Sequence, residues 1–385
     1  MERECYLLPI GPYHPMLHEP EYLQVILEGE RIIDLDIHLG YNHRGVEKIA
    51  ASKPNIYQSL KVVERTCGIC GEAHSACFVL GVEKILGIEV PERAKYIRTI
   101  MFELNRIQSH LLWLGIFAYE LGFETLFQHT WADRSIIMNL LEKISGNRIH
   151  YCMNTIGGVT RDLTKDLMES LERKLKELEK RFNDRAEVFR TDSTVNKRTE
   201  SVGTLNKKKA RELGVVGPTA RASGIKIDVR KDAPYHCYED VEFRIVTRRE
   251  GDARARMLVR IEEVLESMEI IRQVLDKIPK GEINTNKRYF LLKEGEVTSV
   301  VEAPRGENLH FIKTDKERLR RIRIRPPTYA NIFALREMLK GATLADIPSA
   351  LFSLDPCFSC CDRIVVIDLD RKKRDILNLE DLWHA

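Results

Sequence analysis

The stretch VVERTCGICGEAHSACF, residues 62–78, decides the fold together with a second stretch, LDPCFSCCDR, residues 354–363. Each stretch contains a Cys-x-x-Cys pair, whose spacing lets two sulfurs in their thiolate form grip one metal ion. The four cysteines are Cys67, Cys70, Cys357 and Cys360. Since the two pairs lie near opposite ends of a 385-residue chain, we expect a fold that brings these ends together around a metal centre.

Several other kinds of site use such cysteines. A structural zinc site is the commonest, but the pairs of a zinc ribbon are usually separated by about 15–20 residues. A thioredoxin-like site needs one pair within a βαβ pattern, which we do not find. An iron–sulfur cluster stays open, although ferredoxin-type C-x2-C-x2-C spacing is absent from the sequence. The long separation disfavours a local zinc knuckle.

The neighbours of the cysteines favour a metal whose electronic properties are tuned by the protein. Gly68 and Gly71 let the backbone approach a bulky centre, and His74 follows Cys70 by one helical turn if a helix begins there. Asp355 precedes the second pair, and Cys361 is a spare thiol beside it. Charged and imidazole groups around metal ligands adjust ligand basicity and redox potential.

Composition describes a globular protein with a substantial core. Apolar residues make up 43% and charged residues 31%, and the net charge of +3 gives no reason to expect nucleic acid as a partner. The nine cysteines come without a secretory signal, so a disulfide framework is not expected. The sequence contains no run of about 18 uncharged apolar residues, which is the pattern that predicts a transmembrane helix.

Hydrophobic periodicity predicts an α+β fold with a mainly helical core. Apolar and polar residues alternate along residues 22–40, which predicts a β-hairpin with Glu28–Glu30 as its turn. Residues 295–312 predict a second hairpin. Helical spacing predicts three long helices, one from Ile97 to Leu114 and two more in the segments 163–182 and 257–278. The Pro-rich residues 9–20 predict a loop.

We expect one domain over residues 1–385. Its parts are a β-rich N-terminal lobe (1–50), a helical core (51–190 and 250–280), a loop-rich insertion (191–248) and a C-terminal tail (364–385).

The early R-x-C-G-I-C-x-x-x-H and late D-P-C-x-x-C motifs resemble the large, catalytic subunit of nickel-iron hydrogenases. The segments GPYHP, SGNRIHY, GVVGPTARASG, EAPRG and CCDR look most like the group 4, membrane-bound, energy-converting branch, which is related to respiratory complex I. The resemblance runs from about residue 8 to residue 370. It implies that all four cysteines bind nickel, and that Cys70 and Cys360 also bridge to an iron carrying cyanide and carbonyl ligands.

The resemblance also implies an activity and partners. The activity would be reversible reduction of protons to H2. Electrons would come from a small subunit with a [4Fe-4S] cluster, fed by a ferredoxin-like subunit, and membrane subunits would couple the reaction to Na+ or H+ movement. The chain would then be a peripheral subunit on the cytoplasmic side of the cell membrane.

The resemblance assigns roles to residues near the cysteines. Arg305 would project its guanidinium over the open metal face and Asp355 would hold that guanidinium in place. His74 would donate a hydrogen bond to a bridging sulfur or a cyanide. Splitting H2 also requires a base to accept a proton, and both Arg305 and the thiolate of Cys360 are candidates for that base.

The chain departs from soluble hydrogenases at two places. It lacks their N-terminal R-x-E-G-H motif, so Glu19, with His14 and His18, is expected to replace the proton-carrying glutamate. Glu47 matches a glutamate that binds a divalent cation, but Arg363 stands where the cation's histidine would be. We expect the charge of Arg363 to replace the cation.

Two alternatives stay open. One is a complex-I-like quinone or sulfur reductase subunit on the same fold, in whose relatives the nickel-binding thiols are generally incomplete. The other is a non-catalytic scaffold with zinc at the four cysteines. The 22 residues after Arg363 look foldable, which favours a tail that is retained.

Overall fold

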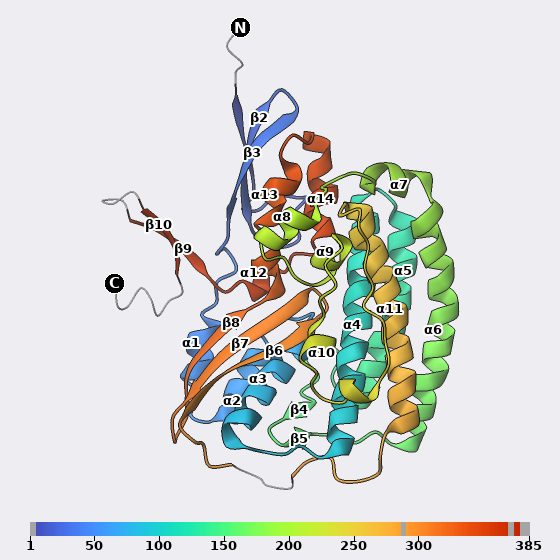
Figure 1. The fold of residues 1–385 in the computed structure, drawn as a ribbon, viewed down its shortest axis with the longest axis vertical. Helices are drawn as coiled ribbons and strands as arrows, with labels where there is room; N and C mark the ends of the chain where they lie inside the picture. The colour runs from blue at the N-terminus through green and yellow to red at the C-terminus, as the bar shows by residue number, and fades with distance from the viewer. Residues whose placement is uncertain (1–4, 286–289, 369–372, 378–385) are drawn as a thin grey trace.

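The structure, a computed structural model, describes residues 5–285, 290–368 and 373–377. A bundle of long helices fills one side of the molecule, and small sheets with shorter helices fill the other (Figure 1). The α+β class and the mainly helical core expected from the sequence are confirmed.

Four long helices form the bundle: α4 (Glu92–Glu120), α5 (Glu124–Ser145), α6 (Lys165–Thr191) and α11 (Ala253–Lys277). Three of them carry the predicted periodicities, whereas α5 was not singled out from the sequence. On α6, Leu171, Leu175 and Leu178 are completely buried. Spacings of three and four residues place these side chains on one face of the helix, against the core.

Helix α4 lies at the centre of the bundle. Its periodicity predicted one buried face, but α5 and α11 pack on it from different sides and nearly all of its residues are buried. Its charged side chains therefore pair inside the protein: Arg98 lies 2.7 Å from Glu83, and Arg106 lies 3.2 Å from Glu103. In the described part of the chain, no helix combines the length and apolar character needed to span a membrane.

The N-terminal sheet is antiparallel in the order β1-β2-β3, with β1 Tyr6–Ile10, β2 Tyr22–Glu28 and β3 Arg31–His38. The hairpin predicted around Glu28–Glu30 is confirmed, and β1 adds a strand that was not predicted. Helix α1 (Val46–Ala51) already begins within the segment expected to be β-rich. The loop between β1 and β2 brings Glu19 to the backbone of Phe358 and Ser359, within the second cysteine pair.

The second sheet, β6-β7-β8, contains the other predicted hairpin. Its strands are β6 (Gly295–Ala303), β7 (Gly306–Thr314) and β8 (Leu319–Arg325). Helix α3 (Gly71–Leu86) packs on β6 and β7, and α2 (Ile56–Glu64) packs on α3. This layer brings the first cysteine pair, at the start of α3, beside the β6–β7 turn.

Shorter elements complete the structure. Residues 191–248 form loops with α7 (Ser193–Thr199), α8 (Lys207–Glu212), α9 (Gly217–Ala222), α10 (Val229–Asp232) and a 3-10 turn (Tyr238–Asp240). Leu205, Ala220 and Tyr238 belong to the main core, so this segment packs as part of the domain. The other elements are β4 (Asn154–Thr155), β5 (Gly158–Val159), α12 (Pro327–Asn331), α13 (Ala334–Leu339), a 3-10 turn (Leu344–Asp346), α14 (Ile347–Ser353), a 3-10 turn (Phe358–Cys360), β9 (Ile364–Asp368) and β10 (Lys373–Leu377).

In the C-terminal tail, which the sequence analysis expected to be foldable, β9 pairs with β10 in an antiparallel arrangement. Residues 369–372 and 378–385 of the tail lie outside the described residues.

Candidate metal centre

The two cysteine pairs meet between the helical bundle and the β6-β7-β8 sheet. Cys67 and Cys70 lie between α2 and α3, and Cys357 and Cys360 follow α14. The Sγ atoms of Cys67 and Cys357 are 3.4 Å apart, those of Cys70 and Cys360 3.6 Å, and those of Cys357 and Cys360 3.2 Å. All four are reduced and at most 3% exposed. The fold therefore gathers four sulfurs from both ends of the chain.

Polar side chains of α4 hold the loop between the first two cysteines. Asn105 Nδ2 and Gln108 Nε2 each donate to the carbonyl oxygen of Ile69 at 2.8 Å. The backbone N–H groups of Ile69 and Cys70 in turn donate to Cys67 Sγ, each at 3.2 Å. This loop is thus shaped to stabilise a thiolate, because its amide groups point at the sulfur.

The four sulfurs are able to bind a cation. Hydrogen bonds from the thiols of Cys357, Cys360 and Cys70 hold the pKa of Cys67 well below its usual value. Four buried thiols this close cannot all ionise unless positive charge joins them, and a divalent metal supplies it as its ligands lose their protons. Four thiolates suit nickel, iron or zinc, so the donor set fits the expected nickel-iron centre without selecting it over zinc.

Arg305 and Asp355 form a buried ion pair beside the sulfurs. Arg305 Nη2 lies 2.7 Å from Asp355 Oδ1, and Arg305 Nε donates to the carbonyl oxygen of Asp355 at 2.8 Å. Arg305 Nη1 lies 3.4 Å from the hydroxyl of Ser109. Burial opposes the charge of Arg305, but Asp355 and the nearby cysteines raise its pKa well above the usual value. Arg305 therefore stays a cation across the working pH range.

Close backbone contacts fix the turn from which Arg305 projects. Gly306 has φ 128° and Gly217, at the start of α9, has φ 65°. A Cβ on Gly217 would lie 2.4 Å from the carbonyl oxygen of Arg305. Only glycine permits this approach and this backbone conformation, which gives the GVVGPTARASG segment a role in placing Arg305.

Asp355 adopts an unusual backbone conformation, with φ 59°. Arg260, fully buried on α11, donates to the carbonyl oxygens of Ser353 at 3.2 Å and Leu354 at 3.3 Å, and so supports the chain just before it. Burial raises the pKa of Asp355 to about 6, although the guanidinium groups of Arg305 and Arg260 lower it. Arg260 was not predicted from the sequence.

His74 lies on the first turn of α3, as its spacing from Cys70 predicted. One ring nitrogen of His74 and the sulfurs of Cys70 and Cys360 all lie within 4.8 Å of one another. Its Nδ1 is 3.1 Å from Nε2 of His310, a buried residue of β7 that the sequence analysis missed. Burial lowers the pKa of His74 to about 4, so the ring is neutral.

Glu19 reaches the second cysteine pair from the loop between β1 and β2. Its carboxylate accepts hydrogen bonds from the backbone N–H groups of Phe358 and Ser359 and from the Ser359 hydroxyl. His18 lies nearby with Nε2 2.9 Å from Glu120, whereas His14 is exposed and accepts a hydrogen bond from the backbone N–H of Met16 within its own loop. Of the three residues proposed for this loop, His14 is the one that the structure places away from the site.

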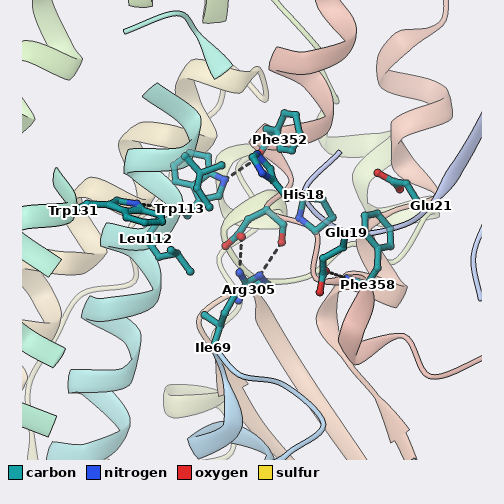
Figure 2. Close-up of a pocket in the computed structure, with 13 residues that line it drawn as sticks. His18, Glu19, Glu21, Ile69, Leu112, Trp113, Trp131, Arg305, Phe352 and Phe358 are labelled. Atoms are coloured by element: carbon teal, nitrogen blue, oxygen red, sulfur yellow. Dashed lines mark hydrogen bonds and ion pairs between the residues drawn. The ribbon is translucent and has the colours of Figure 1, made fainter. Parts of the chain in front are cut away.

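A cavity of about 280 Å³ opens beside the Arg305–Asp355 pair. Figure 2 shows Arg305 at its floor, with Glu19 and His18 on one side and the rings of Trp113 and Trp131 on the other. The remaining lining residues are mostly apolar: Ile69, Leu112, Ile116, Phe352, Pro356 and Phe358, with Glu21. The cavity therefore combines mostly apolar walls with a charged floor, and the guanidinium of that floor lies near the cysteine sulfurs.

Glu47 lies away from the four sulfurs and pairs with Arg363. Arg363 Nη1 lies 2.8 Å from Glu47 Oε1, which also accepts a hydrogen bond from the backbone N–H of Ile324 at 2.8 Å. Arg323 approaches the other carboxylate oxygen at 3.8 Å. Burial raises the pKa of Glu47, and Arg363 partly offsets this. The guanidinium of Arg363 thus pairs with the Glu47 carboxylate, and the replacement of a cation by Arg363 stays a prediction.

If Arg363 replaces a cation, Glu47→Gln should destabilise the protein by about 3 kcal/mol, because it leaves the guanidinium of Arg363 without its charged partner. The double variant Glu47→Gln/Arg363→Gln should recover most of that loss. Thermal unfolding of the purified protein with and without a chelator measures both effects. Anomalous density for a metal between Glu47 and Arg363 would contradict the replacement.

Two protein-family profiles match the sequence of this chain. The sequence profile described as "Nickel-dependent hydrogenase" matches residues 44–189, and the profile described as "Respiratory-chain NADH dehydrogenase, 49 Kd subunit" matches residues 120–294 and 289–363. Together the matches include all four cysteines, Arg305 and Asp355.

Individual relatives cover almost the whole chain. The membrane-bound hydrogenase subunit alpha of Pyrococcus furiosus is 41% identical over 97% of this chain and 92% of its own length. The carbon monoxide-induced hydrogenase of Rhodospirillum rubrum is 38% identical over 93% of this chain and 99% of its own.

A solved structure of a membrane-bound sulfane sulfur reductase, an archaeal respiratory membrane complex, superimposes with a TM-score of 0.88 and 33% identity over 94% of this chain and 100% of that one. The fold, the converging cysteines and these matches agree: this chain belongs to the oxidoreductase family of large subunits that unites nickel-dependent hydrogenases with the 49-kDa subunit of respiratory-chain NADH dehydrogenase.

Proposed function

We propose that this chain is the catalytic subunit of an energy-converting hydrogenase that reduces protons to H2, reversibly, at a nickel-iron centre. The convergence of all four sulfurs carries this proposal. All four cysteines would bind nickel, and Cys70 and Cys360 would also bind iron with cyanide and carbonyl ligands. When bound, the centre supplies the redox chemistry that combines two electrons with two protons.

The surrounding residues would hold charge and protons at defined atoms. Arg305 would present a fixed positive charge beside the sulfurs, since its Nη2 and Nε are anchored on Asp355. His74, a neutral ring, would donate a hydrogen bond to a sulfur. The buried walls around the cluster exclude bulk water, which strengthens each of these interactions.

Electrons would have to reach this site from a partner. Among the described residues, groups of three or more potential metal ligands occur only at the four cysteines with His74. We therefore infer a small subunit with a [4Fe-4S] cluster, a ferredoxin-like subunit that feeds it, and membrane subunits that couple the reaction to ion movement. One of the relatives is a subunit of a membrane-bound hydrogenase and another belongs to a membrane-bound sulfane sulfur reductase, which supports a peripheral position for this chain, on the cytoplasmic side in our proposal.

The direct test of the activity is H2 evolution from a chemically reduced dye by the purified complex. We expect H2 from the wild type and none above background from a Cys357→Ser variant. Reduction of a quinone analogue or of a sulfur compound without H2 evolution would contradict the proposal.

Glu19 is the proposed carrier of protons to and from the cavity. Glu19→Gln keeps an oxygen to accept the N–H groups of Phe358 and Ser359 but cannot ionise, so we expect H2 evolution to fall about 100-fold while nickel and iron contents stay unchanged. The exposed Glu30, on the β2–β3 turn, provides the matched control as Glu30→Gln. Equal rates in the wild type and both variants would exclude Glu19 as the carrier.

The second candidate function is a complex-I-like quinone or sulfur reductase subunit. The cavity of about 280 Å³ favours it, because this volume far exceeds what H2 requires and Arg305 could bind an anionic or carbonyl group at its floor. The complete set of sulfurs favours the hydrogenase. A zinc scaffold would show zinc in place of nickel and iron.

A further inference from the structure

A pair of buried imidazoles adjoins the sulfur cluster: His74 on α3 and His310 on β7. The two side chains are 1% and 0% exposed, their rings are inclined by 19°, and their centroids are 5.4 Å apart. We propose that His310 is a positioning residue that fixes the orientation and the tautomer of His74, so that His74 donates from Nε2 to a cysteine sulfur. This inference rests on the proposed metal centre.

The contact between the rings requires one shared hydrogen. Both rings are buried, and their paired ring nitrogens face each other and the amide of Asn308, with no carboxylate among these partners, so the uncharged form of each ring is favoured. A neutral imidazole carries a hydrogen on one nitrogen only. Across the 3.1 Å between His74 Nδ1 and His310 Nε2, one nitrogen donates and the other accepts.

The sulfurs decide which ring donates. A metal-bound thiolate has no hydrogen and can only accept. Since Nδ1 of His74 is engaged with His310, Nε2 is the nitrogen left to serve the sulfurs of Cys70 and Cys360, and it must carry the hydrogen to do so. Nδ1 then has a lone pair, and His310 Nε2–H must be the donor.

Asn308 supports this assignment from the same strand. Its side-chain amide lies 3.4 Å from His310 Nε2, and its Oδ1 has no hydrogen-bond partner among the described residues. Turning the amide places that oxygen next to His310 Nε2–H as a second acceptor. Two residues apart on β7, Asn308 and His310 share the buried face of the strand.

The spacing between α3 and the sheet is rigid enough to keep the two rings in register. The Ser299 hydroxyl on β6 donates to the carbonyl oxygen of Cys77 on α3 at 2.7 Å. At Gly81, one turn further along α3, a Cβ would lie 2.6 Å from a side-chain carbon of Ile312, so the helix sits directly on the strands. His74 and His310 are therefore held together by packing around them.

The test compares infrared spectra of the iron-bound carbonyl and cyanide in the purified complex. His310→Leu and His310→Met, two apolar variants of different shape, remove the donor, and His310→Gln restores an N–H. We expect both apolar variants to keep their nickel and iron, to shift the carbonyl and cyanide bands, and to lose about tenfold in H2 evolution. The Gln variant should return the bands towards the wild-type positions.

Cys77→Ser is the matched control, because Cys77 lies three residues after His74 on α3 and its thiol hydrogen-bonds to the backbone oxygens of Ser299 and Asn308, to which a serine hydroxyl can also donate. Its bands should coincide with those of the wild type. Unshifted bands in either metal-loaded apolar variant would overturn the role of His310. A wild type without carbonyl and cyanide bands would instead overturn the proposed function.

Discussion

Replacing Cys360 by serine is expected to remove the metal centre and all H2 evolution. The Cys360 sulfur lies 3.2 Å from that of Cys357 and 3.6 Å from that of Cys70, and it also belongs to the group that includes His74. It is therefore the sulfur that belongs to both groups of potential metal ligands. A serine hydroxyl is a harder donor that stays protonated, so it does not replace a thiolate for nickel or iron.

Nickel and iron per protein and the rate of H2 evolution measure the effect. We expect the iron content to fall to background. The rate of H2 evolution should fall by more than about 100-fold, which is the loss typical of replacing a residue that only supports a metal ligand. Cys361 offers a matched control, because it is the residue after Cys360 and is similarly buried, with 2% of its surface exposed. It does not belong to either group of potential metal ligands. Cys361→Ser should keep its metals. Full metal content in Cys360→Ser would show that the ligand set is wrong.

Arg305→Lys is expected to cut H2 evolution by about 100-fold to 1000-fold while the metals remain. A lysine keeps the charge but cannot reproduce the two contacts of the guanidinium, one to the carboxylate and one to the backbone oxygen of Asp355. The charge beside the sulfurs would move, and the pair with Asp355 would loosen.

The pH dependence separates this role from that of an ordinary acid. The pKa of Arg305 is well above its usual value, so its own titration should not appear in the pH profile of the wild type. Arg320→Lys, on the exposed part of β8, should leave activity unchanged. Full activity in Arg305→Lys with intact metal content would mean that the guanidinium has no part in the reaction.

Local patterns in the sequence predicted much of the fold. The alternation of apolar and polar residues identified the β2–β3 and β6–β7 hairpins. Helical spacing of apolar residues identified α6, which buries one regular face, and also α4 and α11, whose large apolar residues keep that spacing although α4 is buried on most sides. Helix α5 went unnoticed, since its polar residues interrupt the stripe, and β1 was missed because it is a short edge strand with an irregular burial pattern.

The cysteines that we propose as metal ligands could be picked out from the sequence because the spacing within each pair is set by chemistry, whereas the residues that support them could not. Gly217 contacts the Arg305 turn and Arg260 supports Asp355, yet each lies far from its partner in the sequence. His310 is one residue in an otherwise ordinary strand. The polar residues that surround Ile107 in the segment 105–110 were the available signal, because polar side chains within a helix that is otherwise predicted to be buried are costly unless they have hydrogen-bond partners.

Elemental analysis of the purified complex, joined to infrared spectroscopy in the region of metal-bound carbonyl and cyanide, tests the central claim most directly. Our account predicts nickel and iron in this subunit and both kinds of band, all lost in Cys360→Ser. Zinc in place of nickel, or iron–sulfur signals without these bands, would contradict it.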